Sequence, residues 1–181
     1  VYKRQVPLAQ ATATFSQICF GPYSVSRIID GNPTLGWAIF EAPCSTTTER
    51  SFDQTAVVET VSDLVSPVPG QPFVIDISLL SGFFSGASLP HALGLFRLSV
   101  TGDDRSTFAD GLSAGGDVTA NWTVLTPYSA IAQATNSAGV PNNNPAAVLT
   151  VQPDSSVLAS GPLPEYNRYR LLAVSPLAAV T

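Results

Sequence analysis

The stretch "LGLFRLSVT", residues 93–101, decides the fold class, because its side chains alternate between apolar and polar character. The apolar members are Phe96, Leu98 and Val100, and the polar members are Arg97, Ser99 and Thr101. A repeat of two residues is typical of a β-strand that buries one face and exposes the other. The stretch therefore predicts a strand whose apolar set points into a core and whose polar set points outward.

Runs of the same kind recur along the chain and predict an all-β protein. They are "ATATF" (11–15), "GWAIF" (36–40), "TAVVET" (55–60), "PFVIDISLL" (72–80), "NWTVLTP" (121–127), "AAVLTVQ" (146–152), "SSVLASG" (155–161) and "YNRYRLLAV" (166–174). Segments rich in Ser, Pro, Gly and Thr separate them. "VQPDSSVLAS" (151–160) predicts a hairpin whose turn is residues 153–156. "SAIAQAT" (129–135) is expected to form at most a short turn of helix.

The composition favours the same fold class. Hydrophobic residues make up 45% of the 181 residues and charged residues 12%, with 15 Pro and 13 Gly. Disordered chains have low hydrophobicity and high charge, so this chain is expected to fold. Many short strands joined by frequent turns are typical of an antiparallel β-sandwich or jelly roll.

The charge of the chain argues against two classes of partner. Its net charge is −5, and Lys3 is its sole lysine. The opening "VYKRQ" (1–5) is either the translation of a sequencing adapter or a natural basic N-terminus, and we exclude it from fold reasoning. Without it the charge is −7, since Lys3 and Arg4 are lost. Phosphate contacts need clustered Lys and Arg, so no nucleic-acid partner is expected. The apolar stretches are shorter than the about 20 residues of a membrane-spanning helix, so no membrane insertion is expected.

The two cysteines, Cys19 and Cys44, fit no metal-binding or redox spacing. Two interpretations stay open. In an exported protein they form a disulfide, whose closed loop would stabilise the fold by about 3 kcal/mol. Otherwise they are two unpaired small apolar side chains in a core.

Three strings, in this order, resemble a galactose-binding-like (discoidin-like) β-sandwich module. They are "IDGNPTLGWAI" (29–39), "QTAVVET" (54–60) and "HALGLFRLSVT" (91–101). Such modules occur as repeats in large exported proteins of environmental bacteria, including planctomycete proteins with cytochrome-c-associated domains. The chain departs from the usual pattern at Leu35, Gln54, Val58 and Leu95, where Thr, His, Phe and Arg are usual.

The resemblance implies a domain organisation. Residues 6–101 would be the C-terminal part of one module, and the polar, Gly-rich stretch 102–121 would be a linker or a long loop. Residues 122–181 would be the opening strands of a second, truncated module, or would complete the same sandwich.

The resemblance also implies a function. We expect a non-catalytic module of an exported multidomain protein that binds carbohydrate or mediates adhesion. Its location would be secreted, periplasmic or at the cell surface. Its partners would be glycans and the neighbouring domains of the same chain. A purely structural spacer module is the alternative, and a glycoside hydrolase fragment ranks third.

The first candidate site is the loop that holds Asp30 and Asn32. In folds of this kind such a loop often holds a structural Ca²⁺ through side-chain and carbonyl oxygens. The alternative is a metal-free turn, in which the Asp30 side chain bonds to the backbone ahead and Gly31 supplies an unusual φ. Leu35, where Thr is usual, weakens the Ca²⁺ hypothesis.

Candidate glycan contacts are Trp37, His91 and Arg97. Trp37 would stack on a sugar ring or else anchor the core. His91, the sole histidine, would contact a ligand or else serve a structural role at the start of a strand. Arg97 would bond to glycan hydroxyls or else join an ion pair across two strands, with Glu59 as its candidate partner.

No catalytic residue is assigned, and the chain is predicted not to be an enzyme. His91 has no nucleophile string such as G-x-S-x-G to accompany it. Retaining glycosidases need two carboxyl groups about 5 Å apart in a cleft. The spacing of four acidic residues near the loop, Glu41, Glu49, Asp53 and Glu59, does not indicate such a pair.

Overall fold

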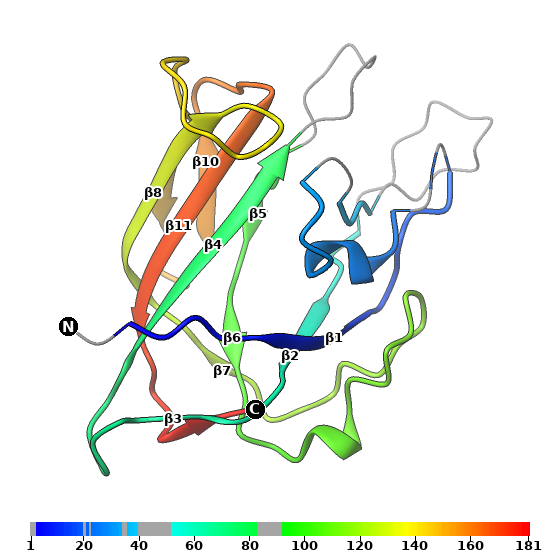
Figure 1. Cartoon of the computed structure of the whole chain (residues 1–181), viewed down its shortest axis with the longest axis vertical. Coiled ribbons are helices and arrows are strands. Elements are labelled where there is room, and N and C mark those ends of the chain that lie inside the picture. Colours follow the sequence, from blue (N-terminus) through cyan, green and yellow to red (C-terminus); the bar gives the residue numbers. More distant parts are fainter. Residues whose placement is uncertain (1–2, 20, 22, 34–35, 40–51, 83–91) are drawn as a thin grey trace. The chain divides into compact units, whose positions relative to one another are not determined.

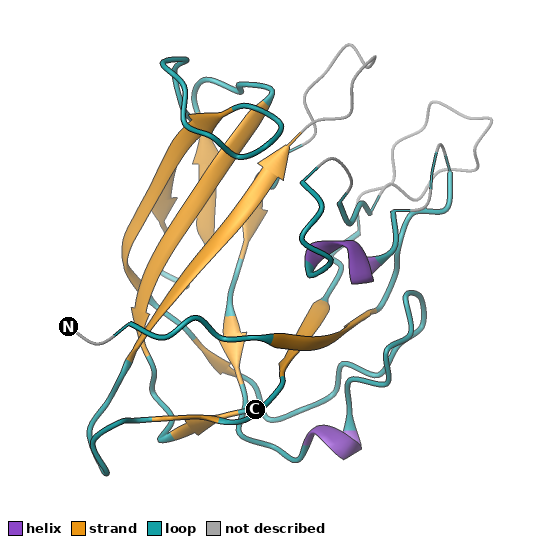
Figure 2. Cartoon of the chain, viewed as in Figure 1, coloured by secondary structure: helices purple, strands orange, loops and turns teal. Residues whose placement is uncertain are grey.

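The computed structural model describes residues 3–19, 21, 23–33, 36–39, 52–82 and 92–181. Those residues form β-strands and two short 3₁₀ helices, without an α-helix among them, so the all-β prediction is confirmed (Figure 2). The elements are β1 (Leu8–Ala13), η1 (Val25–Ile28), β2 (Ala56–Thr60), β3 (Leu64–Val65), β4 (Val74–Gly82), β5 (Leu95–Phe96), β6 (Ser99–Val100), η2 (Arg105–Thr107), β7 (Thr123–Val124), β8 (Pro127–Thr135), β9 (Val148–Val151), β10 (Val157–Ser160), β11 (Tyr166–Val174) and β12 (Ala179–Val180).

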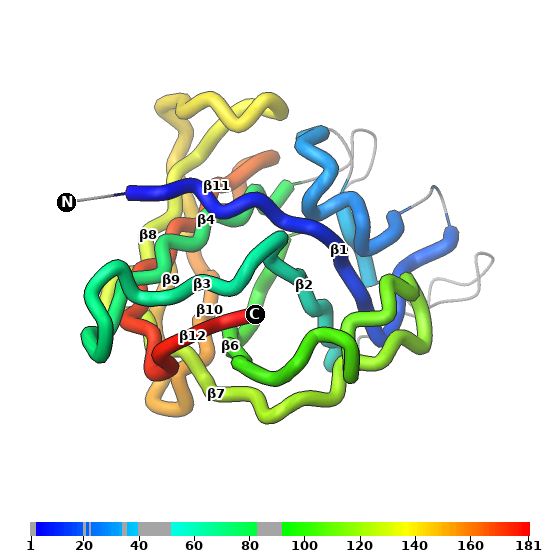
Figure 3. The backbone as a smooth tube through the Cα atoms, turned by 60° about the horizontal axis from the view of Figure 1, so that its bottom comes forward, coloured from blue at the N-terminus to red at the C-terminus, as the bar shows by residue number. Residues whose placement is uncertain are grey.

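The chain divides into two compact units that alternate along the sequence (Figure 3). Unit 1 consists of residues 1–64, 102–121 and 181, and unit 2 consists of residues 65–101 and 122–180. The stretch 102–121 therefore belongs to unit 1. Residues 122–180 share unit 2 with residues 65–101.

The main sheet of unit 2 has the strand order β4-β11-β8, and all its pairs are antiparallel (Figure 1). Nine consecutive residue pairs join β11 to β4, from Tyr166 opposite Gly82 to Val174 opposite Val74. β8 includes the whole of "SAIAQAT", so the expected helical turn is wrong. The nine-residue β8 pairs with β11, and this tertiary pairing overrides the weak local preference of Ala for helix.

A second sheet, with the strand order β5-β10-β9, encloses the core of unit 2 together with the main sheet. Tyr169, Leu171 and Val157 are at most 1% exposed. The Phe96 ring, from β5, lies parallel to the Tyr169 ring of β11, with centroids 6.1 Å apart. Two sheets that face each other across one core make unit 2 a β-sandwich.

The prediction that residues 93–101 bury their apolar set and expose their polar set is correct in part. Phe96 is half-buried and Arg97 is exposed, as predicted. Thr101 was expected to point outward but is only 2% exposed. The cause is that the run forms two short strands, β5 and β6, with different partners, so a single face does not continue through it.

The hairpin predicted over 151–160 is confirmed. β9 and β10 pair antiparallel, with Val157 opposite Val151. In the turn, the backbone N–H of Gln152 donates to the Ser156 carbonyl over 2.8 Å. Ser155 adopts φ +65°, and the Asp154 side chain accepts hydrogen bonds from Ser156 N and Oγ at 3.0 and 2.7 Å.

Unit 1 contains the antiparallel pair β1-β2 and a small core. Ala11, Ala13 and Val25 are at most 4% exposed and pack against Ile29, Trp37, Ala56 and Val58. The strand predicted over 36–40 is wrong for residues 36–39, which the structure describes. The Ala38 carbonyl accepts the N–H of Gln17, and the N–H of Ala38 donates to the Tyr23 carbonyl. These are single bonds and do not form a β-ladder.

The loop 109–117 lies along the second edge of β1. The N–H of Ala13 donates to the Leu112 carbonyl over 2.9 Å, and the N–H of Gly116 donates to the Ala13 carbonyl over 3.0 Å. Gly111 N donates to Thr12 Oγ1 over 2.7 Å. β1 is thus hydrogen-bonded by β2 on one edge and by this loop on the other, although the loop is not a strand.

Candidate functional site

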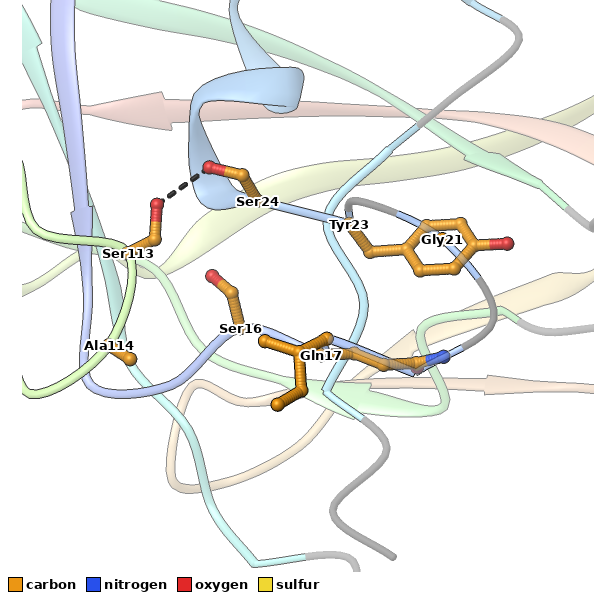
Figure 4. A pocket seen from close by; sticks show the side chains of 8 residues that line it. Ser16, Gln17, Gly21, Tyr23, Ser24, Ser113 and Ala114 are labelled. Carbon is orange, nitrogen blue, oxygen red and sulfur yellow. Dashed lines mark hydrogen bonds between the residues drawn. The ribbon is translucent and has the colours of Figure 1, made fainter. Parts of the chain in front are cut away.

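A pocket of about 360 Å³ opens in unit 1 (Figure 4). Its described lining residues are Ser16, Gln17, Ile18, Gly21, Tyr23, Ser24, Ser113 and Ala114. Figure 4 shows Ser113 and Ala114 on one side, Ser24 above them, Tyr23 on the opposite side and Gln17 below. Two segments about ninety residues apart in sequence therefore build one cavity.

Hydroxyl groups of three serines form hydrogen bonds that hold the lining segments of the pocket together. Ser24 is the N-cap of η1. Its Oγ lies 2.6 Å from Ser113 Oγ, which joins the two segments. Ser16 Oγ accepts the backbone N–H of Val25, the first residue of η1, at 3.1 Å. A free N–H at the start of a helix needs such a partner, so the serines are explained by helix capping as well as by any ligand.

The lining combines aromatic, aliphatic and neutral polar groups. Tyr23 is 8% exposed, and its ring lies 3.1 Å from the place where a Cβ on Gly21 would be, so Gly21 allows the ring to lie against the backbone. Ile18 is 83% exposed, the highest value among the large hydrophobic residues of the described chain. None of the described lining residues is a carboxylate, an imidazole or an amine.

Cys19 lies in the segment that lines the pocket. It is 5% exposed and is disulfide-bonded. Its carbonyl accepts the side-chain N–H of Gln17 over 2.8 Å. The predicted partner Cys44 lies outside the described residues, so the pairing of Cys19 with Cys44 stays a prediction.

Asp30 forms a turn with its own backbone. Its Oδ1 accepts the N–H of Asn32 at 2.8 Å, its Oδ2 lies 3.4 Å from Arg27 Nη1, and Gly31 between them has φ +73°. An Arg guanidinium beside the carboxylate is unfavourable for a cation, so these residues do not fit a Ca²⁺ site. Within the described part of the chain, no group of three or more His, Cys, Asp or Glu side chains could hold a metal ion.

Trp37 is half-buried and lies against the core of unit 1. It packs against the cluster of Ala11, Ala13 and Val25, and its Nε1 donates to the Phe15 carbonyl over 2.9 Å. The donor and one part of the ring are therefore engaged within the fold.

Arg97 is exposed in unit 2, where its charge acts on the carboxyl of Asp154. The hydrogen bonds from Ser156 Oγ and N hold the pKa of Asp154 below its ordinary value of 3.8, and the Arg97 charge adds to this effect. His91 lies outside the described residues. Trp37 and Arg97 belong to different units and neither lines the pocket.

Comparison with protein-family models, with curated proteins and with solved structures gives no match. The resemblance to a galactose-binding-like module thus stays an expectation. Among the described residues, no helix is long and apolar enough to cross a membrane.

The sequence alone does not mark the lining residues of the pocket. Ser16, Tyr23 and Ser24 lie in "SQICFGPYS" (16–24), which carries no recognised motif, and Ser113 lies in the polar stretch expected to be a linker. The one usable signal was Cys19, because a disulfide marks a segment that the fold holds in place.

Proposed function

We propose that this chain is a non-catalytic β-sandwich module that binds a neutral carbohydrate in the pocket of unit 1. The observation that carries the proposal is the lining, in which the Tyr23 ring and the exposed Ile18 side chain lie beside the hydroxyls of Ser16, Ser24 and Ser113. The C–H face of a sugar ring suits an aromatic or aliphatic surface, and its hydroxyls suit neutral hydrogen-bonding groups.

Two further observations support the proposal. The described lining carries no charged side chain, which suits a neutral ligand, while Glu41 and Glu49 lie outside the described residues. The disulfide of Cys19 is typical of a protein that folds in an oxidising compartment, which supports export to the periplasm, the cell surface or the medium. We propose that the module is of the galactose-binding-like kind.

A glycan array probed with the whole chain tests the proposal. We expect retention on a restricted set of neutral glycans. Ala114 is exposed at the rim of the pocket, so Ala114→Phe should fill the pocket without disturbing the core and should reduce retention at least tenfold. The matched control is Ala138→Phe, at a position in unit 2 that is also exposed, and this variant should bind as the unaltered chain does. Equal loss in both variants, or no retention by a folded sample, would contradict the proposal.

A structural spacer is the second candidate, and one observation favours it. The hydroxyls of Ser16, Ser24 and Ser113 already have partners within the fold, so a sugar would have to share or displace those bonds. A folded chain that is silent on the array would favour this function.

A further inference from the structure

The two edges of the β4-β11-β8 sheet differ in how they are protected. An edge strand exposes unpaired backbone N–H and C=O groups, which can pair with another chain, and natural proteins block such edges with proline, charge, bulges or covering loops. β8 has three of these devices. It begins with Pro127, its register with β11 shifts between Leu172 and Ala173, and a bridge from Thr135 to Pro141 covers its far end. There the N–H of Asn142 donates to the Ala134 carbonyl over 3.0 Å.

β4 is the opposite edge of the same sheet, and the described residues show no proline, register shift or covering bridge along it. Its sequence "VIDISLLSG" contains no proline and no lysine, and its nine pairs with β11 run without a register shift. Its one charged side chain, Asp76, is held by Arg170 of β11 through two contacts of 2.9 and 2.6 Å. That carboxylate is thus directed across the sheet toward β11, which limits its value as an edge blocker.

We propose that β4 is the docking edge for the β4 strand of a second copy of this chain, paired antiparallel about Ser78. All nine residues of each strand would then be paired, and two three-stranded sheets would form one continuous sheet of six strands. This proposal concerns unit 2 and does not rest on the carbohydrate site.

Charge and apolar pattern favour a second copy in this orientation. Antiparallel pairing about Ser78 places Asp76 opposite Leu80 of the other copy, so the two carboxylates do not face each other. A parallel arrangement in register would place the two Asp76 side chains side by side, which costs stability because like charges repel. On the other face, Ile77 would lie opposite Leu79, which extends the apolar surface of both sandwiches. The exposed Val74 and Leu80, at 52% and 39%, add apolar side chains to the solvent face of the joint.

Measurement of molar mass by light scattering or sedimentation, from micromolar to millimolar concentration, tests the proposal. We expect the unaltered chain to move from 18.9 kDa toward twice that mass as its concentration rises. Ser78→Lys should leave the mass at the single-chain value, because two lysines would face each other on the symmetry axis. Ser78 is exposed, so this substitution does not disturb the core.

Two controls separate docking from a general effect of charge. The first control, Gln133→Lys, adds the same charge on the protected strand β8. The new lysine lies opposite Arg168 there, just as the lysine of Ser78→Lys lies opposite Arg170. The Gln133→Lys variant should therefore associate as the unaltered chain does. An equimolar mixture of Ser78→Lys and Ser78→Glu should regain the doubled mass. A single-chain mass at every concentration would overturn the proposal. Protection from hydrogen exchange, in that monomer, of the β4 amides that do not bond to β11 would show that the rest of the chain covers this edge. Association of Ser78→Lys at the level of Gln133→Lys would also overturn it.

Discussion

At the scale of single residues, Asp and Asn side chains serve mainly to close turns in this chain. Each of seven accepts a hydrogen bond from the backbone N–H two residues ahead, and they are Asp30, Asp104, Asp110, Asp117, Asn136, Asn142 and Asp154. This is the usual reason why Asp and Asn are frequent in turns. It also explains why the aspartates of residues 103–117 do not gather into a metal site, since each of the three at 104, 110 and 117 is used locally.

The carboxyl of Asp154 provides a test at this scale. Because Ser156 Oγ and N donate to its charged form, its pKa lies below 3.8. The charged form therefore stabilises the β9–β10 turn above the ordinary pKa, and that contribution is lost as the pH falls through the lowered value. We expect Ser156→Ala, which keeps only the backbone donor, to raise the pKa of Asp154 toward 3.8 in a carboxyl ¹³C NMR titration.

The Arg97→Gln variant serves as the comparison for that titration. The Arg97 charge is the weakest of the effects that lower the pKa of Asp154, so its removal should raise the pKa less than Ser156→Ala does. An unchanged pKa in Ser156→Ala would show that the hydroxyl bond does not form in solution.

For the candidate site, local turns could be predicted from single residues, but the pocket could not. A turn at Asp30 followed from three consecutive residues, since Asp, Gly and Asn have strong local preferences. The pocket did not, because its serines gain their role only when Ser113 meets Ser24 across about ninety residues of sequence. The sequence leaves two roles for Trp37, a ligand contact or a core residue, for the same reason. The bond from its Nε1 to the Phe15 carbonyl forms only in the folded chain.

At the scale of elements, a strand could be predicted from the sequence where one of its faces packs against the core. Burial alternates along residues 166–174, because β11 is the central strand and contacts the core on one face, where Tyr169 and Leu171 are buried. β8 was missed because Ala and Gln prefer helix locally, and its pairing with β11 is visible only in the folded chain. Sequence periodicity reports burial, and it does not report the identity of the neighbouring strand.

The contact between the 109–117 loop and β1 gives a test at the element scale. A Cβ on Gly116 would lie 2.4 Å from Thr12 Cγ2 and 2.9 Å from the Ala13 and Leu112 carbonyl oxygens, so Gly116→Ala must separate the loop from the strand. We expect a loss of about 1–3 kcal/mol in the free energy of unfolding, as for other overpacked sites. Urea denaturation followed by the NMR signals of β1 measures it.

Gly36→Ala is the control for that substitution. Nothing lies within 4 Å of a Cβ built on Gly36, which is also in unit 1, so its urea midpoint should stay close to that of the unaltered chain. If Gly116→Ala were as stable as Gly36→Ala, the loop would not lie against β1 in solution.

At the scale of the whole molecule, the two units are interleaved along the sequence. Unit 1 needs residues 102–121, and unit 2 needs residues 122–180 to complete the sheet that β4 begins. The all-β class could be read from composition and periodicity. The assignment of segments to units could not, because it depends on the pairing of β4 with β11, and the sequence of neither strand specifies its partner.

Truncation tests this interleaving. A fragment of residues 1–101 keeps β4 but lacks β11 and β8, so β4 would have no partner in its sheet. The fragment also lacks the 109–117 loop that bonds to β1. We expect it to give a poorly dispersed NMR spectrum, while the full chain gives dispersed strand signals. Dispersed signals from β4 in the fragment would show that residues 6–101 fold as a module of their own.

The separation of β4 from its partner in sequence also has a consequence for biosynthesis. β11 begins about 80 residues after β4 ends, and a ribosome adds about 5–20 residues each second, so a newly made β4 waits several seconds for the strand that covers it. During that interval both of its edges are free. Cells that make this protein in quantity should therefore need a holding chaperone at this stage, and slow translation upstream of β11 should lower the yield of soluble chain.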